Sequence, residues 1–110
     1  MSKVRVQLCP ELLRSSMIRA KMTELLDWVK QFKDEYDTTH RFTVIGTSIE
    51  AAEEVFDITN NPSREEESKD LYGCHRPVSV GDIVIVEELQ EDGSFKEVSY
   101  LCENIGWTAL

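Results

Sequence analysis

Apolar and polar residues alternate at the start of the chain, and this pattern predicts a half-buried strand. The apolar side chains of Val4, Val6 and Leu8 are separated by single polar residues. A period of two places one set of side chains on each face of a sheet. Pro10 follows and is expected to end the strand, because proline cannot donate a hydrogen bond to a neighbouring strand.

The spacing of apolar residues then changes to that of a helix. Apolar side chains recur at intervals of four, three, four, three and four residues between residues 16 and 36, which predicts one amphipathic helix. Ser15 or Ser16 is placed to cap its N-terminus. Leu26 and Trp28 widen the apolar surface, which favours packing on the sheet and predicts self-association as a homodimer or higher oligomer. The stripe consists of Ile18, Met22, Leu25, Val29, Phe32 and Tyr36.

A second strand and a second helix are expected in the next part of the chain. Residues 41–45 are predicted to form the strand, which Gly46 closes. The helix is expected to begin at Thr47, with Glu50 completing a capping box. The sequence Asn-Asn-Pro at residues 60–62 should end it, because proline cannot continue a helix. Its expected buried face consists of Ile49, Ala52, Val55 and Phe56.

The last third of the chain is predicted to be a β unit. Residues 62–77 precede it as a long loop with at most one short helical turn. Residues 83–86 are apolar on both faces, which predicts a central strand that is covered on both sides. An Asp-Gly pair within residues 91–94 predicts a hairpin turn. Residues 95–103 should form the returning strand and residues 107–110 a last short strand.

This order of elements predicts an α+β fold. We expect a mainly antiparallel sheet of about five strands, with two helices packed on one side and a C-terminal β-hairpin unit. The length of 110 residues fits a single domain. Within it, residues 1–61 form the β-α-β-α part, residues 62–77 the loop and residues 78–110 the β unit.

Charge is unevenly distributed along the chain and limits the partners. Residues 1–46 carry eight basic and six acidic side chains, whereas residues 47–110 carry four basic and fifteen acidic ones. The acidic surface argues against direct binding of duplex DNA, because phosphates are repelled. It favours a basic partner protein, or it serves solubility alone.

Other features of the composition predict a cytoplasmic protein. No apolar run approaches the length needed to cross a bilayer, so no membrane partner is expected. The first residues show neither a signal peptide nor a lipidation pattern. The three cysteines are an odd number without regular spacing, which fits reduced thiols better than a disulfide framework.

Two short blocks of the β unit resemble the YodL-like domain, a module of small proteins from phages, conjugative elements and their hosts. The blocks are residues 79–84, Ser-Val-Gly-Asp-Ile-Val, and residues 100–107, Tyr-Leu-Cys-Glu-Asn-Ile-Gly-Trp. Glu103 stands where the family often has Asp, and Trp107 where it often has Phe. The resemblance implies a phage or mobile-element setting in a bacterial cytoplasm and no catalytic residues. By analogy with other such proteins, it implies an inhibitor of a host defence or nucleic-acid-handling protein.

Catalytic and metal-binding patterns are not evident in the sequence. Cys9, His40, Cys74, His75 and Cys102 lack the paired spacing of a zinc site, so no metal is expected. Neither a nucleophile motif nor a phosphate-binding loop is present. We therefore predict a protein that is not an enzyme and has no cofactor.

Asp82 and Trp107 have structural interpretations that are simpler than functional ones. Asp82 is expected to cap its own turn through the backbone. Trp107 is expected to belong to the core.

Three functional hypotheses follow. The first is a protein-binding role in which the acids of the loop and hairpin meet a basic host protein. Those acids are Glu65, Glu66, Glu67, Asp70, Glu87, Glu88, Glu91 and Asp92. The second hypothesis is binding of a small ligand or nucleotide by Arg64, Lys69, Arg76 and Trp107. The third is a structural protein that oligomerises through the first helix.

Overall fold

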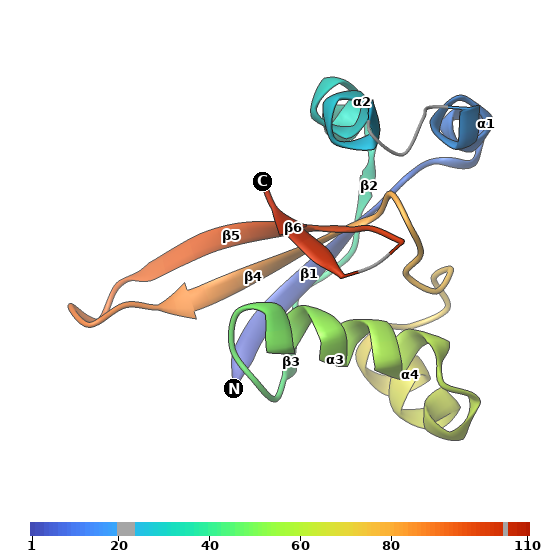
Figure 1. The fold of residues 1–110 in the computed structure, drawn as a ribbon. Helices are drawn as coiled ribbons and strands as arrows, with labels where there is room; N and C mark the ends of the chain where they lie inside the picture. Colours follow the sequence, from blue (N-terminus) through green and yellow to red (C-terminus); the bar gives the residue numbers. More distant parts are fainter. Residues whose placement is uncertain (20–23, 105) are drawn as a thin grey trace.

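The computed structural model describes residues 1–19, 24–104 and 106–110 and shows an α+β fold built on one antiparallel sheet (Figure 1). In these residues the sheet has six strands rather than about five, because the segment after the long apolar stripe supplies two short strands. The main path runs in the order β2-β1-β4-β5-β6, and β3 also pairs with β1. The strands are β1 (Ser2–Leu8), β2 (Asp37–Thr38), β3 (Phe42–Val44), β4 (Ile83–Leu89), β5 (Phe95–Cys102) and β6 (Trp107–Ala109).

β1 lies in the interior of the sheet, and the predicted alternation is confirmed there. Val4 and Val6 are fully buried on one face, and β1 pairs with β4 from Lys3↔Glu87 to Gln7↔Ile83. On the other edge, β2 and β3 pair with the two ends of β1 in turn. Thr39 bridges the gap between them, since its hydroxyl oxygen accepts the Val6 N–H at 2.9 Å. The ladder of β1 is thereby kept nearly continuous.

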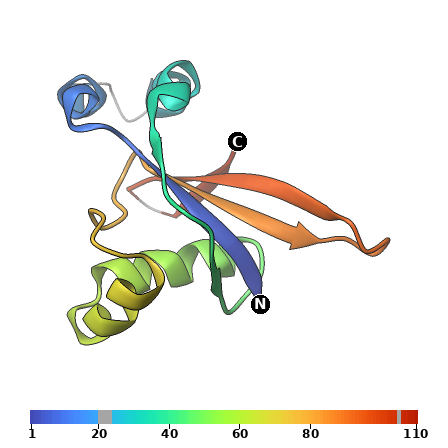
Figure 2. The same cartoon turned by 180° about the vertical axis from the view of Figure 1, so that it is seen from behind.

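Helices cover both faces of the sheet, so the prediction of two helices on one side is wrong. Figures 1 and 2 show α1 and α2 on one face and α3 and α4 on the other. The apolar residues of β4 point alternately to the two faces, and each set needs its own cover. No helix in the described residues is both long and apolar enough to cross a membrane. The helices are α1 (Glu11–Arg19), α2 (Leu25–Phe32), α3 (Ile49–Asn60) and α4 (Glu65–Leu71), with 3-10 turns η2 (Lys33–Glu35) and η3 (Pro62–Arg64).

The core consists of two clusters separated by the sheet. The cluster beneath α3 and α4 contains Val4, Val6, Phe42, Ala51, Ala52, Val55, Ile58, Tyr72, Val78, Val84, Val86, Tyr100 and Cys102, with Leu8 and Val44. The cluster beneath α1 and α2 contains Cys9, Met17, Leu25, Val29, Tyr36, Ile83, Ile85 and Leu101. The central position predicted for residues 83–86 is confirmed, because Val84 and Val86 belong to the first cluster and Ile83 and Ile85 to the second.

The single helix predicted for residues 16–36 is corrected in its first half. α1 begins at Glu11, so Ser15 and Ser16 lie inside it and do not cap it. Ile18 is 70% exposed and Met17 is buried in its place. Met22 lies outside the described residues. In the second half of the stripe Leu25, Val29 and Tyr36 are buried as predicted, whereas Phe32 is half-buried and ends α2 four residues early.

Leu26 and Trp28 are half-buried against the second cluster. The indole N–H of Trp28 donates to the Ser16 hydroxyl at 3.1 Å, and its ring lies 4.7 Å from that of Phe32. Part of the apolar surface that suggested self-association is therefore used within the chain. Self-association itself stays a prediction.

The second helix begins later than predicted and turns a slightly different face inward. α3 starts at Ile49, and Ser48 precedes it without a capping side-chain hydrogen bond, so the Thr47–Glu50 capping box is wrong. Ile49 and Phe56 are exposed at 44% and 39%. The buried residues are Ala51, Ala52, Val55 and Ile58.

The end of α3 at Asn60, just before Pro62, is confirmed. The following segment is more ordered than the predicted loop, because η3 and α4 occupy most of its first ten residues. Glu65, Glu66 and Glu67 form the first turn of α4, where the helix dipole favours acids.

Candidate functional site

The carboxylate of Asp82, at the entry to β4, is the centre of a dense network of hydrogen bonds. Its side chain is fully buried. One oxygen accepts the backbone N–H of Cys9 at 2.9 Å, and the other accepts the N–H of Ser79 at 2.8 Å. The bond to Ser79 confirms the expected turn cap. The bond to Cys9 ties the turn to the end of β1, which was not predicted.

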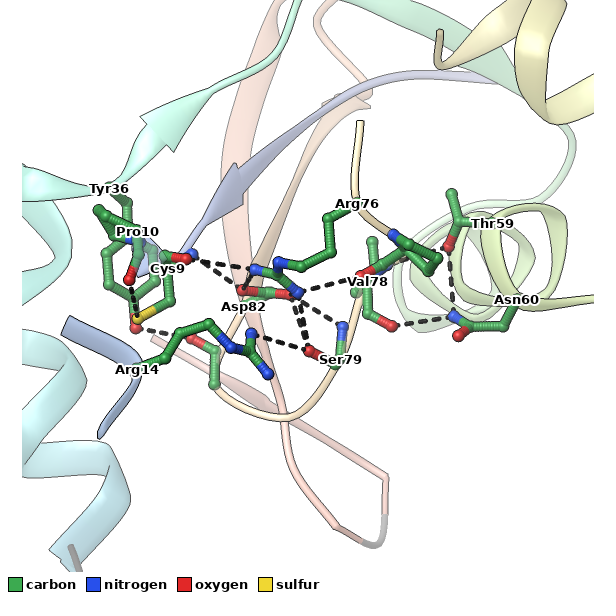
Figure 3. Close-up of polar contacts among 12 residues, drawn as sticks. Cys9, Pro10, Arg14, Tyr36, Thr59, Asn60, Arg76, Val78, Ser79 and Asp82 are labelled. Atoms are coloured by element: carbon green, nitrogen blue, oxygen red, sulfur yellow. Dashed lines mark hydrogen bonds and ion pairs between the residues drawn. The ribbon is translucent and has the colours of Figure 1, made fainter. Parts of the chain in front are cut away.

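Arg76 neutralises this carboxylate. Its two terminal nitrogens lie 2.8 Å from the two oxygens of Asp82, and one of them also donates to the Ser79 hydroxyl (Figure 3). The Tyr72 hydroxyl holds the Arg76 carbonyl at 2.6 Å. Hydrogen bonding to Asp82 raises the pKa of Arg76. Because the carboxylate is enclosed and paired, it is suited to holding the loop against the sheet rather than to reacting with a substrate.

The cations proposed for ligand binding each have a separate local partner. Arg64 pairs with Glu54, Asp57 and Glu67. Lys69 pairs with Glu65, one turn earlier in α4. Trp107 is half-buried and packs edge-on against Phe56, at 6.4 Å between ring centres. With Arg76 committed to Asp82, the structure does not bring these side chains together around one ligand.

The acids of α4 are largely matched by bases on their own segment. Glu67 is held by Arg64, and Glu65 lies 3.3 Å from Lys69. Glu66 and Asp70 are exposed without an ion pair among the described residues. α4 and the β4–β5 hairpin turn lie at opposite ends of the molecule (Figures 1 and 2). The two predicted sets of acids therefore form two surfaces rather than one.

The acids of the β4–β5 hairpin differ in how they are held. Glu87 is only 15% exposed in its side chain and pairs with Arg5 and Arg41. Glu88 accepts the Tyr100 hydroxyl at 3.0 Å. Glu91 and Asp92 are exposed in the turn itself. Residues 87–97 contain five acids and one lysine, a local balance of −4.

The outer end of this hairpin extends beyond the rest of the sheet. β1 accompanies β4 only as far as Glu87, and β6 accompanies β5 only from Tyr100. Gly93 takes a positive φ of 86° and closes the turn, with Gln90 donating to the Ser94 carbonyl at 2.7 Å. The end of the hairpin is therefore well formed although its strands have no outer neighbours in the part of the chain that the structure describes.

Two large apolar side chains stand on this projecting end. Leu89 and Phe95 are cross-strand partners and are 67% and 65% exposed. They share the face that α1 and α2 cover further along the sheet, because Ile83, Ile85 and Leu101 alternate in step with them. Neither residue was predicted as part of a site. The sequence did contain a signal for the pair, because one apolar residue precedes the polar turn and another follows it, at equal distances from its centre.

The cysteines and histidines do not assemble into a reactive centre. Cys9 and Cys102 are buried in different clusters, and burial raises the pKa of the Cys102 thiol to about 11. His40 and His75 lie 6.3 Å apart between ring centres, near exposed Cys74. Within the described ranges, no group of three or more His, Cys, Asp or Glu side chains is arranged to hold a metal ion.

Comparisons with models of protein families, with curated proteins and with solved structures found no match to this chain. The resemblance to the YodL-like domain stays a prediction that rests on its two short blocks. Ile105 of the second block lies outside the described residues.

Proposed function

We propose that this chain is a protein-binding module that engages a basic partner through the outer end of the β4–β5 hairpin. The observation that carries the proposal is the exposed pair Leu89 and Phe95 on a projecting, acidic hairpin. Interfaces draw most of their affinity from a few apolar anchors that become desolvated, while charges at the rim set the rate of association. The hairpin offers both features in one place.

The hairpin is a better candidate than α4, the other acidic surface. The acids of α4 are partly neutralised by Arg64 and Lys69, whereas Glu91 and Asp92 protrude at a turn next to an apolar pair. The apolar pair itself lies on the paired strands β4 and β5, which hold it in place beside these acids. Of the acids first proposed for binding, we assign the central role to Glu88, Glu91 and Asp92.

The resemblance to the YodL-like domain supports a biological setting for this proposal. The partner would be a host protein with a basic surface, such as a defence protein or one that handles nucleic acid. A small acidic protein that occupies such a surface would act as an inhibitor, because it competes with phosphates for the same cations.

Retention of proteins from a bacterial lysate on immobilised chain tests the proposal with matched variants. Leu89→Ser with Phe95→Ser removes the anchors, and Glu91→Gln with Asp92→Asn removes two hairpin charges. Glu66→Gln with Asp70→Asn removes two charges from α4 as a control. We expect a specific partner to be lost with the first variant, weakened with the second and retained with the third.

Salt provides a second readout of the same experiment. Retention should fall between low and high ionic strength, and it should fall less for the Glu91→Gln, Asp92→Asn variant. If the same proteins are retained equally by the wild type and both hairpin variants, the hairpin is not the binding surface. Normal melting temperatures of all three variants would show that folding is unaffected.

A further inference from the structure

The outer edge of β5 carries backbone groups that no neighbouring strand covers. β6 pairs with Tyr100, Leu101 and Cys102, and Leu110 donates its N–H to the Ser99 carbonyl at 2.8 Å. From Phe95 to Val98, the described residues contain no strand on this side. The opposite side of the same stretch is fully paired with β4.

The direction of each backbone group on this edge follows from the ladder. Cys102 donates its N–H to Asp82 and Ser94 accepts from Gln90, so even-numbered residues of β5 bond toward β4. Ser99 accepts from Leu110, so odd-numbered residues bond outward. Because hydrogen-bonding direction alternates along an antiparallel strand, the N–H and C=O groups of Phe95 and Glu97 point away from β4 and remain open.

The side chains beside this edge have a distinct pattern. Phe95 is exposed, and the side chain of Glu97 is 49% exposed. Both lie on the same face of the sheet, with Leu89 and Glu87 opposite them on β4. A strand added to the edge would place alternate side chains against Phe95 and Glu97. The favourable choices are an apolar residue beside the first and a lysine or arginine beside the second.

We infer that the open edge of β5 accepts an extended segment of the partner as an additional antiparallel strand, in which basic and apolar residues alternate at every second position, on the face that Phe95 and Glu97 share. The inference rests on the proposed function and specifies how the hairpin would bind. Main-chain hydrogen bonds to Phe95 and Glu97 would supply affinity, and the alternating side chains would supply selectivity. The negative balance of residues 87–97 is complementary to such a segment.

A second copy of this chain is a poorer occupant of the edge. Two copies of β5 paired about a two-fold axis at Glu97 would place Glu97 opposite itself. An axis at Lys96 would place Lys96 opposite itself. Like charges directly opposite in a sheet destabilise the pairing. The charges that discourage self-pairing here are therefore the same ones that select a basic strand.

Two capped peptides of about seven residues serve as probes, a length chosen to cover the open edge. In the first, the alternating peptide, lysine and valine alternate at every second residue with threonine between them, so that both types lie on one face. The other has the same composition, with the lysines at one end and the valines at the other. Amide hydrogen exchange of the wild-type chain is followed by NMR with each peptide. We expect the alternating peptide to slow exchange at Phe95 and Glu97, with little change at Lys96, whose N–H already bonds to β4.

Two substitutions at one position separate the backbone from the charge. Glu97→Pro removes the outward N–H and the carboxylate, whereas Glu97→Gln removes the carboxylate and keeps the N–H. Both variants lose the ion pair of Glu97 with Arg5, at 2.8 Å, so their difference reports on the backbone. Proline is tolerated where the N–H of an edge strand faces solvent. We expect Glu97→Pro to weaken binding of the alternating peptide about tenfold, and Glu97→Gln to weaken it only a few-fold. The exchange measurement uses the wild type and does not depend on folding of the proline variant.

The outcomes distinguish the two proposals. Equal binding of both peptides, with equal effects of the two substitutions, would overturn strand addition and leave charge-driven binding by the hairpin intact. The absence of binding by either peptide at low salt, up to about 1 mM, would also overturn strand addition. The lysate experiment with the Leu89 and Phe95 variants decides the proposed function separately.

Discussion

Arg76 and Asp82 face each other in a bidentate ion pair, with 2.8 Å separating each terminal nitrogen from its own carboxylate oxygen. The carboxylate is fully enclosed, while the side chain of Arg76 is 28% exposed. Because the same oxygens accept the N–H groups of Cys9 and Ser79, the pair joins the end of β1 to the turn that enters β4. The contact is therefore expected to stabilise the whole sheet.

Arg76→Met tests this stabilisation. Removing one partner leaves an uncompensated buried charge, and we expect a loss of about 3–5 kcal/mol in the free energy of unfolding. Lys69→Met removes an exposed ion pair on α4 and should cost less than about 1 kcal/mol. Urea denaturation of both variants measures the difference. Similar losses for the two would show that Asp82 does not depend on Arg76.

Val29→Asp and Ile18→Asp compare two positions of the same sequence stripe. Val29 is fully buried on the inner face of α2, whereas Ile18 is 70% exposed on α1. A carboxylate at position 29 loses its hydration without gaining a partner, so we expect this variant to unfold or to lose several kcal/mol. Ile18→Asp should melt within a few degrees of the wild type, as followed by circular dichroism. A large loss at position 18 would contradict the assigned face of α1.

Gly81→Ala and Gly93→Ala separate a steric effect from a backbone effect. Both glycines have positive φ, at 93° and 86°, so either substitution costs roughly 1 kcal/mol in backbone strain. A methyl group at position 81 would also collide with the sulfur of Met17, whereas position 93 is open. We expect Gly81→Ala to lower the melting temperature more. Gly81→Ala in a Met17→Ala background should recover part of the additional loss.

Thiol reactivity should distinguish the three cysteines. Cys74 is exposed, and Cys9 and Cys102 are buried. An aromatic disulfide reagent at pH 8 should label one thiol rapidly in the native state and the other two only as the chain opens. Cys74→Ser should abolish the rapid phase. Rapid labelling of two or three thiols would mean that the core opens far more readily than its packing implies.

Stability should decline in alkali. Burial raises the pKa of Cys102 from 9.0 to about 11, so the folded state holds this proton more tightly than the unfolded state does. The associated stability is complete below pH 9 and is lost as the pH rises toward 11. The loss is roughly 2–3 kcal/mol. Urea midpoints between pH 7 and pH 11 measure it, and Cys102→Ala should flatten the dependence on pH below 10.

The strands were predictable because each rests on a simple local pattern. Val4 and Val6 alternate with polar residues and are buried on one face, and the two-faced apolar run from Ile83 to Val86 lies in the sheet interior. That run also predicted cover on both faces, yet both helices were expected on one side of the sheet. A prediction of helices on one side only was therefore inconsistent with the sequence itself.

The remaining errors have two causes, a local signal that was passed over and the influence of distant segments. The regular stripe suggested one long helix, yet Pro10 and Glu11 already form a good helix start, and α1 begins there. The turn cap by Asp82 was predictable because Ser79 is three residues away. The bonds of Asp82 to Cys9 depend on tertiary packing, which a local pattern does not encode. The exposure of Leu89 and Phe95 arises because β1 pairs with β4 only as far as Glu87 and β6 pairs with β5 only from Tyr100.

The interior position of β1 has a consequence for biosynthesis. β1 leaves the ribosome well before its partner β4, since Lys3 pairs with Glu87, far along the chain. Until β4 is made, one edge of β1 has no neighbouring strand and its backbone N–H and C=O groups stay unpaired. This makes the nascent chain prone to aggregate or to bind chaperones. A stop codon or proteolytic cut between residues 73 and 82 would make this state permanent. The last third of the chain, which supplies β4, therefore protects β1 from pairing with other chains.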